Sequence, residues 1–162
     1  MSCYRFIAST NELPEIENPH VQLYSINEAL ANGIEIDTEL MELGLDLDEP
    51  EMILWVENEE LLEEITLIQE EDPDYSDPHT QLTFRYTLEA GRYTEERAEQ
   101  LVTHIKEHLQ TGGTLELWDT WMDDNGESIV TSLELNDLKP EHTAFLFSIE
   151  GAEQPTCLVV KN

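Results

Sequence analysis

Basic residues are scarce in this chain of 162 residues, which has 7 Lys and Arg against 37 Asp and Glu. The formal net charge is −30 at pH 7, and the segment between Arg5 and Arg85 contains no Lys or Arg but 22 of the acidic residues. Coulomb repulsion disfavours binding to nucleic acid or to an anionic membrane surface. The sequence therefore predicts a cationic partner, either a basic protein surface or metal ions. Solubility, or adaptation to a salty interior, is the simpler explanation of the same charge.

Long hydrophobic runs and cysteines are also rare. No apolar run approaches the length needed to cross a bilayer, and residues 1–10 lack the charged and apolar regions of a signal peptide. Cys3 and Cys157 lie near opposite ends, and neither belongs to a C-x-x-C pair. This usage favours free thiols in a reducing cytoplasm, with a disulfide between the two as the alternative.

Familiar catalytic motifs are missing. The chain contains no G-x-S-x-G, no phosphate-binding loop and no dinucleotide fingerprint, and neither cysteine has a context that marks it as reactive. These absences weaken an enzymatic hypothesis, although catalytic residues need not be close in sequence.

The first half of the chain alternates between apolar patterns and acidic loops. Ser25 and Glu28 have the spacing of a capping box, and Gly33 is suited to end the helix that follows. Residues 34–50 predict a partly ordered connection with one short helical turn. Asn58 is a suitable cap for a helical turn in the acidic stretch that follows it. Strands are predicted at residues 3–9, 52–57 (buried), 65–70 and 81–89.

The second half carries the strongest helix signal. Thr94 is a suitable N-cap, Gly112 and Gly113 can end the helix, and the apolar stripe between them is Ala98, Leu101, Val102, Ile105 and Leu109. Residues 114–135 predict a hairpin with Asn125-Gly126 at its turn, followed by a helix at 140–149 and a strand at 157–161. We therefore predict a single α+β domain over residues 1–162, with a mainly antiparallel sheet of about six or seven strands and two or three helices packed on it.

A possible zinc motif lies within the strongest helix. HIKEH, residues 104–108, matches the H-x-x-E-H pattern of a class of zinc peptidases. His104 and His108 are neighbours on a helix and could share a metal ion. The helical wheel, however, turns Glu107 towards water and places His108 at the edge of the apolar stripe. A metal-dependent hydrolase is therefore the alternative hypothesis, and boundary histidines are the simpler one.

A second possible metal site lies in the loop EEDPDYSDPH. Asp72, Asp74 and Ser76 have the spacing of calcium ligands, but the sixth position of the pattern holds Asp77 instead of glycine. The twelfth position holds Thr83 instead of glutamate. An adventitious zinc or calcium ion is conceivable here and at the histidines. A solvated Asp-Pro loop is the simpler interpretation.

A third candidate is the predicted hairpin WDTWMDDNGE. Tryptophan is a common anchor of protein interfaces, and an acidic rim around two of them would suit a basic partner. The residues of this predicted surface are Trp118, Trp121, Asp119, Asp123, Asp124 and Glu127. The favoured function is thus a non-enzymatic cytoplasmic protein that presents an acidic surface to a basic partner protein. Inhibitor or immunity proteins, and mimics of nucleic acid charge, have this character.

Overall fold

The computed structural model describes residues 3–72, 74–122, 126–148 and 150–162. Contacts divide the chain into two compact units, one formed by Met1–Glu17 and Glu63–Asn162 and the other by Asn18–Leu62. We call them the sheet unit and the acidic unit. The single domain expected from the sequence stays a prediction. No helix among the described residues is both long enough and apolar enough to cross a membrane.

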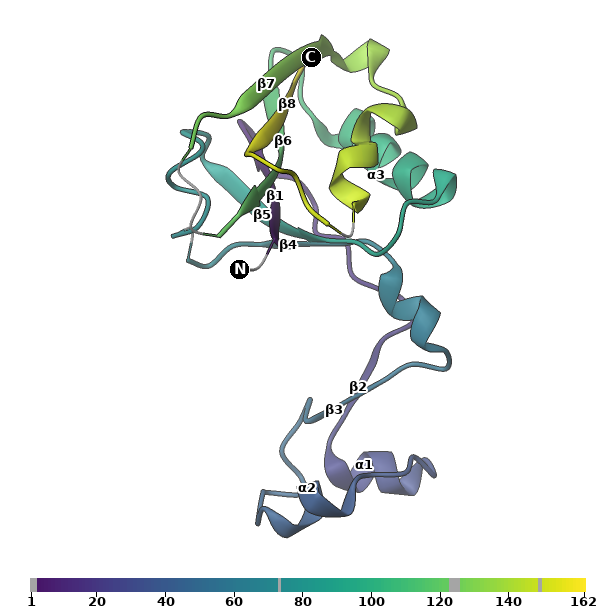
Figure 1. The fold of residues 1–162 in the computed structure, drawn as a ribbon. Helices are drawn as coiled ribbons and strands as arrows, with labels where there is room; N and C mark the ends of the chain where they lie inside the picture. The colour runs from purple at the N-terminus through teal and green to yellow at the C-terminus, as the bar shows by residue number, and fades with distance from the viewer. Residues whose placement is uncertain (1–2, 73, 123–125, 149) are drawn as a thin grey trace. The chain divides into compact units, whose positions relative to one another are not determined.

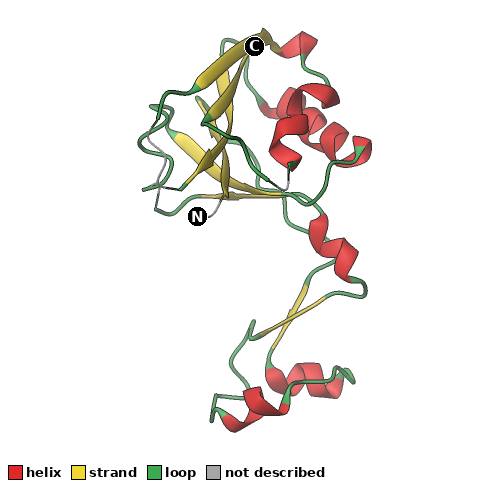
Figure 2. Cartoon of the chain, in the orientation of Figure 1, coloured by secondary structure: helices red, strands yellow, loops and turns green. Residues whose placement is uncertain are grey.

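The sheet unit is built around six strands, and the chain has the predicted α+β character (Figures 1 and 2). Its neighbours pair antiparallel except for β7 and β8, which run parallel. The predicted strands at 3–9, 65–70, 81–89 and 157–161 are all found, some with shorter bounds. In spatial order the strands are β4 (Thr66–Gln69), β5 (Phe84–Glu89), β1 (Cys3–Ser9), β6 (Thr114–Trp121), β8 (Thr156–Lys161) and β7 (Ile129–Glu134).

The predicted hairpin at residues 114–135 is wrong, because β8 lies between β6 and β7. Cys157 of β8 pairs with Trp118 on one side and with Val130 on the other. Burial explains this order. Three of the six residues of β8 are buried, whereas β7 is exposed along most of its length and serves as an edge. The predicted turn residue Asn125 lies outside the described residues.

One face of the sheet, here the inner face, is covered by helices (Figure 1). Helix α3 (Glu95–His108) is capped by Thr94, whose side chain accepts a hydrogen bond from the Arg97 amide. The whole predicted stripe of α3 is buried, so the predicted helix face is confirmed. Two 3-10 helices, η2 (Leu135–Asp137) and η3 (Pro140–Phe147), add Leu135, Leu146 and Phe147 to the same core, and Leu138 joins it from the connection between them. The helix predicted at 140–149 is therefore a shorter 3-10 helix.

The opposite, outer face carries a smaller aromatic cluster. Phe6 and Trp118 stack at 5.8 Å between ring centroids, and Tyr4 stacks on Phe6 at 5.3 Å. The loop after β4 covers part of this cluster, since His79 lies 5.3 Å from the Trp118 ring and Tyr75 lies 5.8 Å from Tyr4. Both faces of the sheet are therefore covered, at least in part.

The acidic unit has little core. Its elements are β2 (Gln22–Tyr24), α1 (Ile26–Ala31), α2 (Thr38–Glu42) and β3 (Ile53–Trp55), and the 3-10 helix η1 (Glu59–Glu63) follows at its end. The capping box at Ser25 and Glu28 is confirmed, with both hydrogen bonds present. The buried strand predicted at 52–57 is wrong: β3 is short, and its central Leu54 is 54% exposed. Among the described residues β3 pairs with β2 alone, so both strands of this small sheet are edge strands.

Candidate functional site

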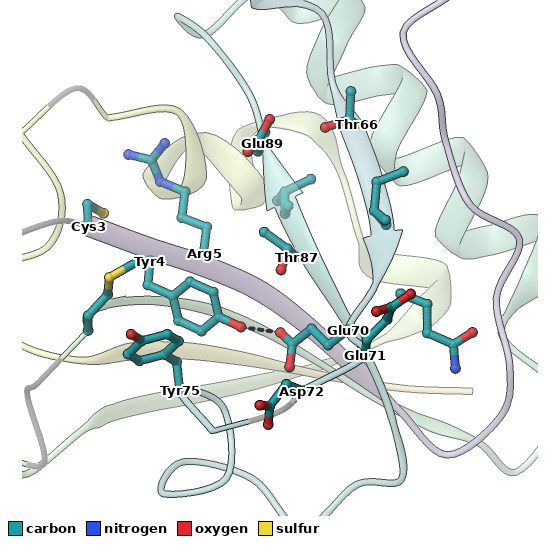
Figure 3. Close-up of a pocket in the computed structure, with 14 residues that line it drawn as sticks. Cys3, Tyr4, Arg5, Thr66, Glu70, Glu71, Asp72, Tyr75, Thr87 and Glu89 are labelled. Carbon is teal, nitrogen blue, oxygen red and sulfur yellow. Dashed lines mark hydrogen bonds between the residues drawn. The ribbon is translucent and has the colours of Figure 1, made fainter. Parts of the chain in front are cut away.

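A pocket of about 610 Å³ opens beside the aromatic cluster, on the outer face of the sheet unit (Figure 3). Strands β1, β4 and β5 and the loop after β4 contribute its walls. Tyr4 and Tyr75 supply aromatic surface, and Ile68, Leu88 and Met122 supply apolar surface. The carboxylate-bearing residues that line it are Glu70, Glu71, Asp72 and Glu89.

The lining of this pocket carries strong negative charge. Arg5 is the single Lys or Arg among the described residues that line it, and its side chain extends away from Tyr4 and Glu70 (Figure 3). The Arg5 guanidinium instead donates a hydrogen bond to the Ser148 carbonyl and lies 3.6 Å from Asp119. The four carboxylates are therefore left without a cationic neighbour in the pocket lining.

Glu70 is held in place by hydrogen bonds from two side chains. It accepts hydrogen bonds from the Tyr4 hydroxyl and, at 2.6 Å, from the Ser76 hydroxyl. Burial, followed by the bond to Glu70 and its negative charge, raises the pKa of the Tyr4 hydroxyl. Tyr4 thus stays neutral, and its ring is held in place on the pocket wall. Sequence analysis did not find this site because its residues come from separate segments. Of its lining residues, Asp72 was predicted as a site residue, although as a calcium ligand, and the alternation of Tyr4 with Arg5 in β1 was the other sign in the sequence.

The loop predicted as a calcium site is organised differently. Ser76 is fully buried and directs its hydroxyl to Glu70, and Asp77 forms an ion pair with Arg85. Both side chains are therefore engaged within the protein. Asp72 instead lines the acidic pocket, whereas Asp74 is exposed and does not line it.

The HIKEH histidines are adjacent, as the helix predicts. The rings of His104 and His108 are 4.7 Å apart, and Glu107 is exposed. A surface pocket of about 390 Å³ is lined by His104 and Glu107 but not by His108. Burial and the nearby His108 charge lower the pKa of His104 below the ordinary value of about 6.5 for histidine. Among the described residues, no three His, Cys, Asp or Glu side chains are grouped so that they could hold a metal ion.

The residues of the acidic rim predicted around the tryptophans are only partly exposed. Trp118 is 5% exposed and stacks within the outer cluster, where its indole N–H donates to Glu116. Asp119 is 1% exposed. Trp121 is half-buried and donates to the Ala152 carbonyl, while Glu127 is exposed. Two of the predicted contact residues, Trp118 and Asp119, are thus buried. Predicted residues Asp123 and Asp124 lie outside the described part of the chain.

Asp119 is buried on the inner face, where it forms a polar cluster with the partly buried Cys3 and Arg5. The Cys3 thiol donates to Asp119 Oδ1 at 2.8 Å. Burial, with the hydrogen bond and charge of Asp119, raises the pKa of Cys3 to about 11, and burial raises the pKa of Asp119. The thiolate that a nucleophile needs is therefore disfavoured. Both cysteines are free, and burial also raises the pKa of Cys157.

The second concentration of charge lies in the acidic unit. Residues 18–62 include no Lys or Arg, and all twelve acidic side chains there are exposed. These residues are Glu28, Glu35, Asp37, Glu39, Glu42, Asp46, Asp48, Glu49, Glu51, Glu57, Glu59 and Glu60. Their carboxylates have no Lys or Arg side chain within the unit to neutralise them.

No family model, no curated protein and no solved structure matches this chain significantly. The function is therefore argued from the chemistry of its own residues.

Proposed function

We propose that this protein is a non-enzymatic, cytoplasmic binding protein that presents an acidic surface to a basic partner protein. The observation that carries the proposal is the acidic pocket of Figure 3, which combines four carboxylates with two tyrosine rings. A lysine or arginine side chain matches both features. Carboxylates attract its charge, and the face of an aromatic ring stabilises a nearby cation by about 0.5–2 kcal/mol.

The pocket has room for such a side chain from a partner. Tyr75 is 47% exposed, so its ring is available at the rim, whereas Tyr4 is held by Glu70. The exposed carboxylates of Glu71, Asp72 and Glu89 are available for a new ion pair. The high net charge of the rest of the chain would add long-range attraction and speed the encounter.

Binding of a basic probe tests this proposal. The probe is a fluorescent peptide of alternating lysine and serine, and its affinity is measured by anisotropy at low salt. The pocket variant combines Glu71→Gln, Asp72→Asn and Glu89→Gln. A matched control removes the same charge from exposed positions elsewhere in the sheet unit, through Glu134→Gln, Asp137→Asn and Glu141→Gln.

The pocket variant should bind the peptide roughly tenfold more weakly than the wild type, because three exposed ion pairs of up to about 1 kcal/mol each are lost. The control variant should lose much less. The association rate for the wild type should fall steeply as salt is added. Equal losses in the two variants would refute the pocket as the site. Absence of binding at low salt would refute the proposed function itself.

A further inference from the structure

The two-stranded sheet of the acidic unit carries an exposed leucine pair. Leu23 of β2 and Leu54 of β3 are direct partners across the antiparallel ladder, so their side chains lie on the same face. Leu23 is 47% exposed and Leu54 is 54% exposed. On the opposite face, Tyr24, Ile53 and Trp55 are half-buried. The sheet therefore has one partly covered face and one open apolar face.

This sheet is also open at its edges. Each of its strands has one neighbour among the described residues, so the outer N–H and C=O groups of both strands face away from the ladder. A two-stranded sheet alone is marginally stable in water. The rest of the acidic unit offers little support, since Ser25, Ile26 and Ala29 are its buried residues. A third strand and a covering apolar surface would both stabilise it.

The charge of the acidic unit determines what kind of chain can supply a third strand and a covering apolar surface. The twelve exposed carboxylates of the acidic unit lie between β2 and β3 or after β3 along the chain. The unit contains no Lys or Arg. A second copy of this chain would bring like charges together, which is unfavourable. A segment that alternates basic and apolar residues matches both the apolar face and the acidic surroundings, because alternate side chains of a strand point to opposite faces.

We propose that the β2–β3 sheet is a docking surface for an extended basic segment of a partner protein. The segment adds as a strand to an open edge and lays its apolar side chains against Leu23 and Leu54. This inference rests on the proposed function and defines the chemistry of the partner: alternating cationic and apolar residues in an extended conformation.

Two peptides of equal charge separate this surface from simple charge attraction. One alternates lysine with valine, and the other is the lysine–serine probe described above. The test variant is Leu23→Thr with Leu54→Thr, since threonine keeps the β preference of a strand while removing apolar surface. Leu43→Thr is the matched control, because Leu43 belongs to the same unit, lies outside the sheet and is 68% exposed. All measurements use the full chain.

The wild type should bind the lysine–valine peptide about tenfold more tightly than the lysine–serine peptide. The double threonine variant should lose that preference and keep its affinity for lysine–serine, and Leu43→Thr should change neither. An unchanged preference in the double variant, or an equal loss in the Leu43 control, overturns the docking surface while leaving the proposed function standing. Failure of both peptides to bind overturns both proposals.

Sedimentation provides the remaining arm of the test. The wild type and the double threonine variant should sediment as the same species in the absence of peptide. A wild-type dimer that the double variant converts to a monomer would overturn the proposal, because a second copy would then be the occupant of the leucine face.

Discussion

The two units of this chain use the same residue types in opposite ways. The sheet unit buries the apolar stripe of α3 against both its strands and the 3-10 helices, and it covers the other face of the sheet with an aromatic cluster. The acidic unit leaves Leu23, Leu30, Met41, Leu43, Leu54 and Leu62 exposed. Burial of apolar surface is the main stabilising term in folding. The sheet unit thus has the means to be stable alone, whereas the acidic unit gains most from a partner.

Charge separates the units in the same way. In the sheet unit Arg97 pairs with Glu63 at 3.1 Å and with Glu64 at 3.0 Å, and Arg85 pairs with Asp77. The acidic unit has no Lys or Arg with which to form such pairs. Its carboxylates therefore repel one another without compensation, and this repulsion opposes compaction.

The largest expected effect is on the core of the sheet unit. Ile105 is fully buried, so Ile105→Ala should lower the free energy of unfolding by about 2–5 kcal/mol. Leu43→Ala in the acidic unit removes a side chain that is 68% exposed and should cost far less. His104→Ala, which lies off the buried stripe of α3, should also cost little. Chemical denaturation of the three variants measures these differences. Equal losses of unfolding free energy in Ile105→Ala and Leu43→Ala would contradict the difference in packing between the two units.

Salt should have the next largest effect. Screening acts over about 30 Å at 0.01 M salt and about 10 Å at 0.1 M, so moderate salt shields exposed carboxylates from one another. The melting temperature should therefore rise from low to moderate salt. The amides of residues 18–62 should gain the most protection against hydrogen exchange. A melting temperature that is flat from about 10 to 500 mM salt would show that the carboxylates do not repel one another appreciably.

The smallest effect concerns His104 and pH. Its pKa in the folded protein lies below 6.5, so the unfolded chain binds the proton more readily. The free energy of unfolding should therefore fall as pH drops from about 7.5 through 6.5. His104→Gln removes this contribution, while the carboxylates affect both proteins alike. The stability of the wild type relative to the variant should decrease over this range, as urea titrations can measure. A constant difference would contradict the burial of His104.

The features that could be predicted from the sequence are those set by residues close together along the chain. The cap at Thr94, the buried stripe of α3 and the capping box at Ser25 depend on residues within a few positions of each other, and all three are found. The prediction of a hairpin at 114–135 was wrong because strand order depends on β8, a later segment that takes the place between β6 and β7. The prediction of a buried strand at 52–57 was wrong because its apolar run has the pattern of a buried strand, yet Leu54 leaves one face of β3 exposed.

The candidate site shows the same division. Acidic character could be counted directly from the sequence, but its location could not. The pocket joins Tyr4 from β1, Glu89 at the end of β5 and Tyr75 from the loop after β4, and only the folded sheet brings these residues together. The predicted Trp118 and Asp119 were attractive as surface residues, yet alternation within β6 turns each towards a covered face of the sheet.

Hydrogen exchange with and without a basic peptide tests the central contrast most directly. In the free protein, the amides of α3 should exchange slowly and those of β2 and β3 quickly, because the acidic unit has little buried structure. A saturating lysine–valine peptide should slow exchange in residues 22–24 and 53–55 and leave α3 almost unchanged. Equal protection of β2, β3 and α3 in the free protein, with no change on adding peptide, would contradict the account.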